Sequence, residues 1–327
     1  MFKDIKEQFE KEKPTMESAV LTFHGVDGYD VYNCSLPFYF SDGKRYIYGR
    51  VEKRGEWSRS RTMLFEETGP DDWTKVEGSD SLPIEDPNVA SIGGQLLLSG
   101  VHVMHGKQRP AYFYNYFYKG TDLNDMYYFE TGPKDMKDIR LVELPGGRIG
   151  LFSRPRGEEI MKKYGCESMV GYAEINSLDE LCSDVIDNAE YISGMFADGE
   201  WGGANQLYYL DSGYIGVIGH QCYPIPQENA NPIQVYANMA FIFDPKQHKV
   251  IHSKVIGTRS CYPDYPAKLP HLVDCAFTGG IVPRSDGKYD LYSGIGDTGE
   301  GRLVIDYPFE GYGNIVVFDK DTSCVHL

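Results

Sequence analysis

The fold of this chain is decided by the stretch Ile84-Glu85-Asp86-Pro87-Asn88-Val89-Ala90-Ser91-Ile92, which continues through the turn Gly93-Gly94 into Gln95-Leu96-Leu97-Leu98-Ser99-Gly100. Two apolar runs joined by a glycine turn predict a β-hairpin. Pro87 lacks an amide hydrogen and fixes its own φ, so Asp86 is expected where regular strand pairing begins. A residue before proline also favours an extended backbone. In a single hairpin, such an aspartate is more often a solvated turn residue than a functional one.

The same hairpin pattern occurs five times along the chain. Its turn glycines are 51, 53, 66 and 74 residues apart, at Gly43, Gly94, Gly147, Gly213 and Gly287. A repeat of about 50 residues with several strands in each unit is typical of a propeller blade. The sequence therefore predicts an all-β, five-bladed β-propeller in which residues 1–327 form a single domain. Two packed β-sheets with accidental hairpins are the alternative.

The first segment of the chain carries two further predictions. Residues 1–14 are rich in charge and are expected to form a short helix or an N-terminal arm. The apolar run 19–23 predicts a strand that pairs into the last blade. Such a strand would close the ring and leave no free sheet edge there.

Composition limits the partners and the compartment. Lys+Arg 32 against Asp+Glu 48 gives a net charge of -16, which disfavours nucleic acid and anionic membranes. The chain shows no secretory leader pattern and no membrane-length apolar run. Its seven cysteines are odd in number and have no C-x-x-C spacing, so neither a zinc site nor a disulfide framework is implied. We expect a cytoplasmic protein without a cofactor or metal, and the oligomeric state stays open.

Polar residues stand where the inner strands of the predicted blades begin and where their partner strands end. In a propeller these positions meet around one axis. They comprise Asn33, Asp86, Asn205 and Asp274 at the beginnings, and Arg50, Arg154, His220 and Asp297 at the ends. Structural roles are the alternative: His220 is as readily a hydrogen-bonded core histidine as a ligand contact, and Arg154 could pair with a structural carboxylate.

Carboxylates around one axis suit the hydrolysis of glycosides with inversion. One carboxyl group protonates the leaving oxygen, and the other removes a proton from water. Their surroundings must push the two pKa values apart. Asp86 is the candidate acid and Glu200 the candidate base, with Glu85 and Glu300 as weaker base candidates. Trp201 follows Glu200 and is either a core residue or a surface on which a sugar stacks.

The order of motifs resembles glycoside hydrolase family 130, the five-bladed β-mannoside phosphorylases and hydrolases. The resemblance runs from about residue 33 to about residue 297. It implies that Asp86 is the proton donor and that Glu85 and Asn88 contact the substrate beside it. The matching segments are Arg50-Val51-Glu52, Glu85-Asp86-Pro87-Asn88-Val89, Ser153-Arg154-Pro155, Gly219-His220 and Tyr292-Ser293-Gly294-Ile295-Gly296-Asp297.

Three departures from that family bear on the reaction. Asn88 stands for an arginine, Ser153 for a histidine, and Glu200 or Trp201 for a lysine that helps to hold phosphate in the phosphorylases. A carboxylate in place of that lysine would repel phosphate and supply a base for water, so the sequence favours hydrolysis of short oligosaccharides. A phosphorylase with Arg154 and His220 on inorganic phosphate is the first alternative. A non-catalytic sugar-binding propeller is the second.

Overall fold

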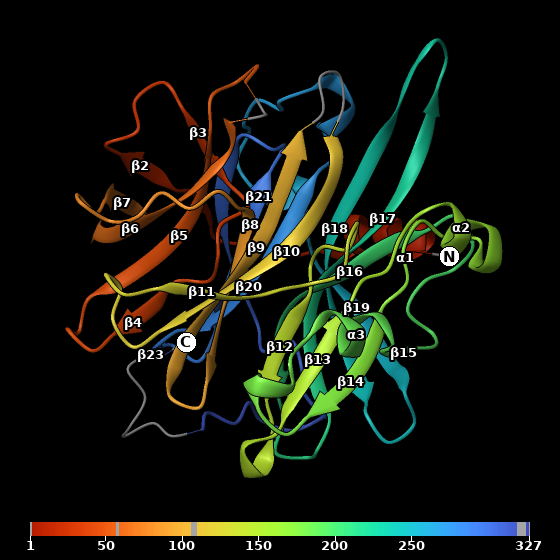
Figure 1. Ribbon diagram of the computed structural model, residues 1–327. Helices are drawn as coiled ribbons and strands as arrows, with labels where there is room; N and C mark the ends of the chain where they lie inside the picture. The colour runs from red at the N-terminus through yellow and green to blue at the C-terminus, as the bar shows by residue number, and fades with distance from the viewer. Residues whose placement is uncertain (1, 57–58, 106–109, 319–324, 327) are drawn as a thin grey trace.

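Strands arranged as five sheets dominate the computed structural model, which describes residues 2–56, 59–105, 110–318 and 325–326. The sheets surround one axis, and the predicted five-bladed β-propeller is confirmed (Figure 1). Each blade continues the hairpin pattern of the sequence, because each glycine turn joins an inner strand to the next strand outward.

The first blade is the most elaborate of the five. Its sheet runs in the order β2-β7-β6-β5-β4-β23, and β3 also pairs with β5. The strands are β2 (Thr22–His24), β3 (Asp30–Tyr32), β4 (Phe38–Phe40), β5 (Arg45–Glu52), β6 (Arg61–Gly69), β7 (Asp72–Lys75) and β23 (Val325–His326).

The other four blades are four-stranded antiparallel sheets. The second contains β8 (Glu85–Ile92), β9 (Gln95–His105), β10 (Pro110–Gly120) and β11 (Tyr127–Thr131), and the third contains β12 (Arg140–Glu143), β13 (Ile149–Ser153), β14 (Gly171–Ile175) and β15 (Glu190–Tyr191). The fourth contains β16 (Trp201–Tyr209), β17 (Ile215–Gln227), β18 (Ala230–Asp244) and β19 (Lys249–Thr258). The fifth contains β20 (Ala276–Pro283), β21 (Tyr289–Ile295), β22 (Gly299–Ile305) and β1 (Ser18–Val20).

The ring closes as the sequence predicts. Strand β1 pairs with β22 and becomes the outer strand of the fifth blade. The next segment, β2, then pairs in parallel with β7 of the first blade. The apolar run 19–23 is therefore divided between two blades and ties the end of the ring to its beginning.

Few helices accompany the strands. The predicted N-terminal helix is α1 (Phe2–Glu12), and α2 (Glu158–Tyr164) and α3 (Ser183–Asp187) belong to the third blade region. Short 3-10 turns occupy Pro145–Gly147, Leu178–Glu180, Arg259–Cys261 and Pro270–Leu272. Within the described ranges, no helix has the length and apolar character needed to cross a bilayer.

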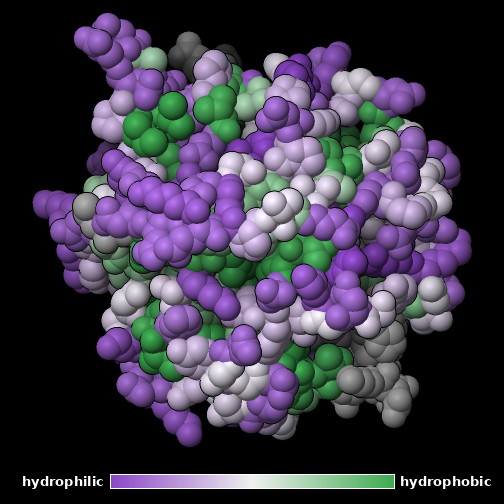
Figure 2. Space-filling view, turned by 180° about the vertical axis from the view of Figure 1, so that it is seen from behind, coloured by the Kyte–Doolittle hydropathy of each residue, from purple (hydrophilic) through white to green (hydrophobic). Residues whose placement is uncertain are grey.

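The apolar core lies between neighbouring blades. One cluster joins Ile47 and Phe65 of the first blade to Val89 of the second, and another joins Phe152 of the third to Phe241 of the fourth. Two more clusters join the second blade to the third and the fourth to the fifth. Figure 2 shows the back of the molecule as mostly hydrophilic, with hydrophobic residues in separate patches. Burial of apolar faces between blades thus fixes the angular position of each sheet around the axis.

The backbone at Asp86 differs from the prediction. Instead of an extended conformation, Asp86 has a φ of 50°, in the left-handed region. The pairing of β8 with β9 shifts register between Glu85 and Asn88, so Asp86 and Pro87 form a bulge. A bulge re-aims the side chain that it carries. The local preference imposed by Pro87 is outweighed by the contacts that Asp86 makes at the axis.

Candidate active site

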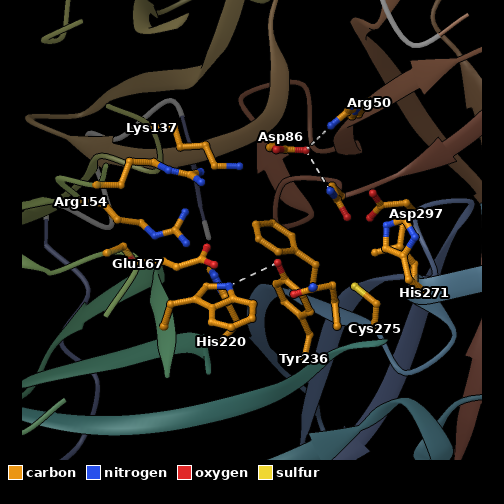
Figure 3. Close-up of a pocket in the computed structure, with 17 residues that line it drawn as sticks. Arg50, Asp86, Lys137, Arg154, Glu167, His220, Tyr236, His271, Cys275 and Asp297 are labelled. Carbon is orange, nitrogen blue, oxygen red and sulfur yellow. Dashed lines mark hydrogen bonds and ion pairs between the residues drawn. The ribbon is translucent and has the colours of Figure 1, made fainter. Parts of the chain in front are cut away.

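All five blades contribute side chains to one cavity at the axis, with a volume of about 480 Å³. Figure 3 shows Lys137, Arg154 and Glu167 on one side of it, facing Arg50, Asp86 and Asp297 on the other. The remaining lining residues are Asn33, Arg156, Ser168, Trp201, His220, Gln234, Tyr236, His271, Leu272, Cys275 and Phe277. The cavity is thus a polar chamber with anionic and cationic sides.

Asp86 is held by an arginine that is itself immobilised. Arg50 Nη1 lies 3.0 Å from Asp86 Oδ1, and Asn33 Nδ2 donates to the same oxygen at 2.9 Å. Arg50 also donates to Glu52 Oε2 at 2.8 Å and lies 3.3 Å from Glu85 Oε2. Burial alone would raise the pKa of Asp86, but the charges of Arg50 and Lys137 outweigh it and hold that pKa below its usual value. Asp86 is therefore a carboxylate in the empty site.

Three pocket residues have a left-handed backbone although none is glycine. The φ angles are 47° at Asn33, 50° at Asp86 and 56° at Asp297. Such conformations are uncommon for residues with a Cβ and concentrate at functional sites. Gly294 makes room for one of them, since a Cβ there would lie 1.9 Å from Asn33 Oδ1. The fold accepts local strain where it presents these side chains to the cavity.

Asp297 is a second aspartate that lines the cavity. Among the described residues it forms no hydrogen bond or ion pair, and it lines the cavity beside the Asp86 carboxylate. Burial raises the pKa of Asp297, and the negative charge of Asp86 adds to the effect against the opposing charge of Arg50. Burial likewise raises the pKa of Glu85 to about 7. The environment therefore separates the acidities of neighbouring carboxyl groups, as acid–base chemistry requires.

The opposite side of the cavity carries an excess of positive charge. Arg154 is fixed by Asp138, whose Oδ2 accepts from Nη1 at 2.5 Å, and by the Gly202 carbonyl, which accepts from Nε at 2.6 Å. Within the described residues, the side chains of Lys137 and Arg156 form no hydrogen bond or ion pair. The fixed guanidinium group of Arg154, beside the guanidinium group of Arg156 and the ammonium group of Lys137, is suited to bind a phosphate or another oxyanion.

His220 and three aromatic residues lie between the two charged sides. His220 Nδ1 lies 2.6 Å from Asn205 Oδ1, whereas its buried Nε2 has no partner. Burial and the charge of Arg154 hold the pKa of His220 well below its usual value, so the ring is neutral and Nε2 is free to bond a ligand. Its ring centroid lies 4.8 Å from Phe277 and 5.8 Å from Tyr236, and the Trp201 indole N–H donates to the Tyr236 hydroxyl at 3.5 Å. We call Trp201, Tyr236 and Phe277 the aromatic floor.

Seven of the twelve residues predicted for the site line the cavity: Asn33, Arg50, Asp86, Arg154, Trp201, His220 and Asp297. Asn88 and Asn205 lie beneath it, around a much smaller space shared with Asn33 and Asp86. Asn88 Nδ2 bonds Gln206 Oε1 at 2.7 Å across the axis. Glu85 contacts Arg50 without lining the cavity, and buried Glu300 accepts from the Cys34 amide at 3.0 Å. These groups support the cavity from outside its lining.

Glu200 and Asp274 do not line the cavity. The Glu200 carboxylate accepts from the Phe2 amide at 2.7 Å, from Gln221 Nε2 at 2.7 Å and from the Ala197 amide at 3.1 Å. Asp274 instead pairs with Lys6 at 3.0 Å. Strand β16 begins at Trp201, and Glu200 precedes it. Trp201 lines the cavity whereas Glu200 bonds to α1, so the basis for assigning Glu200 as the base no longer holds.

Sequence reasoning missed Lys137, Arg156, Glu167, Tyr236 and His271, all of which line the cavity. A usable signal existed for Lys137. It stands three residues before β12, the inner strand of the third blade, and Asp86 lies within the beginning of β8, the inner strand of the second. Arg156 and Glu167 come from the irregular segment between β13 and β14, where no periodic pattern marks them.

Residues 7–311 match the family DUF1861, described as a protein of unknown function, and the chain belongs to that family. No curated protein matches it. The predicted resemblance to mannoside phosphorylases is confirmed by a solved structure with 48% sequence identity, and a structure from glycoside hydrolase family 130 shares the fold.

Two of these structures come from Leishmania mexicana. MPT-4, a mannose phosphorylase solved with a phosphate ion, is 48% identical, with 97% of this chain and 96% of that chain covered and a TM-score of 0.90. MPT-1, a GDP-Man-dependent mannosyltransferase, is 43% identical, with 97% and 98% covered and a TM-score of 0.88. A family 130 enzyme that targets β-1,2 mannosidic linkages is 13% identical, with 93% and 97% covered and a TM-score of 0.58, and so shares the fold.

Proposed function

We propose that this protein is a mannoside phosphorylase. Inorganic phosphate would attack the anomeric carbon of a terminal mannosyl unit in a short oligosaccharide, and the glycosidic C–O bond would break. The products are mannose 1-phosphate and a chain shortened by one sugar. Phosphate loses one hydrogen, and the oxygen of the leaving sugar gains one as it becomes a hydroxyl group, so the reaction balances. The observation that carries the proposal is the cationic side of the cavity, which faces the Asp86 carboxylate across an aromatic floor.

The cationic side supplies the phosphate site. Arg154 is pre-oriented by Asp138 and Gly202, so little side-chain entropy is lost when it binds an oxyanion. Lys137 adds an ammonium group without a protein partner. The free Nε2 of neutral His220 accepts a hydrogen bond from a hydroxyl of the phosphate or of the sugar. The 48% identical mannose phosphorylase, solved with a phosphate ion, supports this assignment.

The aromatic floor suits the mannosyl ring. Trp201, Tyr236 and Phe277 offer apolar surface, and polar groups surround it. Among the described residues Oδ1 of Asn33 has no hydrogen-bond partner, and the Asp297 carboxyl group lines the same cavity, so both are available to sugar hydroxyl groups. A sugar lying on the floor would thus have phosphate on one side and Asp86 on the other.

Asp86 is the group that we assign to proton transfer. The charges of Arg50 and Lys137 hold the pKa of Asp86 below its usual value. A phosphate dianion on Lys137 would offset the second of these charges and raise that pKa, which favours the protonated form that delivers its proton to the glycosidic oxygen. In the reverse direction, ionised Asp86 takes the proton from the acceptor hydroxyl. Proton delivery is in this way linked to the presence of phosphate.

Hydrolysis is the second candidate, and one carboxylate favours it. Glu167 lines the cationic side of the cavity, where it could remove a proton from water in place of phosphate. The preference for hydrolysis drawn from the sequence relied on Glu200, which lies outside the lining. The two reactions differ in product, because hydrolysis releases free mannose.

The test is the incubation of the protein with a panel of manno-oligosaccharides, with and without inorganic phosphate. Phosphorolysis predicts mannose 1-phosphate that forms only with phosphate. Free mannose formed at a rate indifferent to phosphate would establish hydrolysis instead. Sugar binding by calorimetry with no product after long incubation would establish a binding protein. We also propose a cytoplasmic location, which fits the free thiols of Cys34, Cys166 and Cys222 and is checked by cell fractionation.

A further inference from the structure

We infer that helix α1 positions the sugar-binding wall of the pocket, acting through Glu200 and Asp274. The contacts of α1 carry this inference, and only the expected change in KM rests on the proposed function. The sugar-binding wall is defined as Trp201, Tyr236, His271 and Cys275. The two carboxylates that stand beside this wall in the sequence both bond to α1 rather than to the cavity.

The first anchor holds the beginning of β16. Glu200 Oε1 accepts from the Phe2 amide at 2.7 Å, and its other oxygen accepts from Gln221 Nε2 at 2.7 Å. The residue that follows is Trp201, which pairs with Cys222 across the β16–β17 ladder. The carboxylate therefore connects the start of α1 with the two strands that fix the Trp201 ring.

The second anchor holds the segment that precedes β20. Lys6 Nζ bonds Asp274 Oδ2 at 3.0 Å, and the Lys6 side chain is only 11% exposed although lysine usually reaches solvent. The Asp274 carbonyl accepts from the Tyr236 amide at 2.9 Å. His271 and Cys275 flank Asp274 in the chain. Through Asp274, this ion pair thus connects α1 with Tyr236 and with the segment that carries His271 and Cys275.

A third contact is apolar and lies at the base of the long β17–β18 ribbon, which projects from the body in Figure 1. Buried Phe2 packs edge-to-face on Tyr223, with ring centroids 5.6 Å apart. Tyr223 follows Cys222, which pairs with Tyr236. The same short helix therefore contacts residues beside Trp201 and Cys275 and also contacts β17, the strand that pairs with both β16 and β18.

The phosphate-binding cations have a different origin. Lys137, Arg154 and Arg156 come from the third blade region, and Asp86 comes from the second. Helix α1 packs on β17 and β19 of the fourth blade. Arg154 bonds the Gly202 carbonyl next to Trp201, but it keeps a second anchor at Asp138. Loosening α1 should therefore displace the groups that touch the sugar more than the groups that touch phosphate. If α1 contributed only to the stability of the fold, loosening it would not raise the KM for mannobiose more than the KM for phosphate.

The experiment compares Lys6→Met with Lys3→Met. Both changes remove a lysine from α1 and keep an unbranched side chain, but the Lys3 side chain is 57% exposed and its ion pair within the described part of the chain is with Glu7 at 3.9 Å. We expect Lys6→Met to raise the KM for mannobiose roughly five- to tenfold, with kcat and the KM for phosphate nearly unchanged. Asp274→Asn should match it, and the double variant should be no worse than either single one.

Thermal melting of each variant confirms that it is folded under the assay conditions. The inference is overturned if folded Lys6→Met keeps the wild-type KM for mannobiose, if the KM for phosphate rises equally, or if Lys3→Met has the same effect. Should the wild type show no turnover at all, the proposed function fails, and hydrogen exchange then decides the inference. Faster amide exchange in residues 199–203 and 270–276 of Lys6→Met supports it, and unchanged exchange there overturns it.

Discussion

Replacing Lys137 by methionine tests most sharply how the two sides of the cavity cooperate. Lys137 lines the cationic side and, among the described residues, has no hydrogen bond or ion pair that its loss would break. Its charge nevertheless acts on Asp86, Asp138 and Asp297. The substitution removes a ligand of phosphate and an electrostatic influence on Asp86, with little expected change in folding.

The size of the effect follows from the interaction that is lost. A hydrogen bond to a charged group contributes about 1.5–3 kcal/mol. Because 1.4 kcal/mol corresponds to a factor of ten, the KM for phosphate should rise roughly 10- to 150-fold. The KM for the oligosaccharide should change little, since the aromatic floor and Asp297 lie apart from Lys137 (Figure 3).

The pH dependence provides a second readout with a defined sign. Lys137 helps to hold the pKa of Asp86 below its usual value. Without Lys137 that pKa rises. Synthesis from mannose 1-phosphate needs ionised Asp86, so it proceeds above this pKa and is lost as the pH falls through it. The acidic limb of kcat/KM for synthesis therefore moves to higher pH in the variant.

The assay is the release of inorganic phosphate during synthesis, and its uptake during phosphorolysis, across a pH series. Lys134→Met is the matched control, because Lys134 belongs to the same loop but its side chain is 57% exposed and contacts only Asp135 and the Tyr112 ring. An unchanged KM for phosphate in Lys137→Met, or an acidic limb that stays in place, would refute the reasoning.

Three further predictions concern single carboxyl groups. Asp86→Asn should lower kcat by a factor of about 10²–10⁴, the usual contribution of a positioned acid or base, while mannobiose still binds in calorimetry; a variant with near-normal kcat would remove Asp86 from the mechanism. Glu167→Gln should leave phosphorolysis largely intact, whereas loss of all turnover would favour the hydrolytic assignment. Asp138→Asn should lower the free energy of unfolding in urea by about 3–5 kcal/mol, because Asp138 is fully buried and pairs with Arg154 and Arg140. The exposed Asp135→Asn is its control, and equal midpoints for the two variants would contradict the buried-pair account.

The repeat was the most informative part of the sequence for the fold. Hairpins with glycine turns recur because each blade must bury two faces against its neighbours, so hydrophobic strands and turn residues alternate in every unit. The irregular parts of the first blade were not predictable in this way. Strand β3 and the C-terminal β23 are short, and β23 joins the sheet by pairing with β4, almost the whole length of the chain away.

For the site, the sequence identified Asp86, Arg50 and Asp297, whose strand-end positions place them at the axis. It could not distinguish Glu200 from Trp201, because it does not show at which residue β16 begins or which face of that strand is inside. It also could not anticipate that α1 covers that outer face. Asp274 was misjudged for the same reason, since the lysine that pairs with it lies 268 positions away.

The central claim is that the cationic side of the axial cavity binds the inorganic phosphate that attacks the sugar. The most direct measurement is phosphorus NMR of the protein incubated with manno-oligosaccharides and inorganic phosphate. The account predicts a growing mannose 1-phosphate signal that is greatly reduced in Lys137→Met and in Asp86→Asn. Release of free mannose at an equal rate without phosphate, and no sugar phosphate at any time, would contradict it.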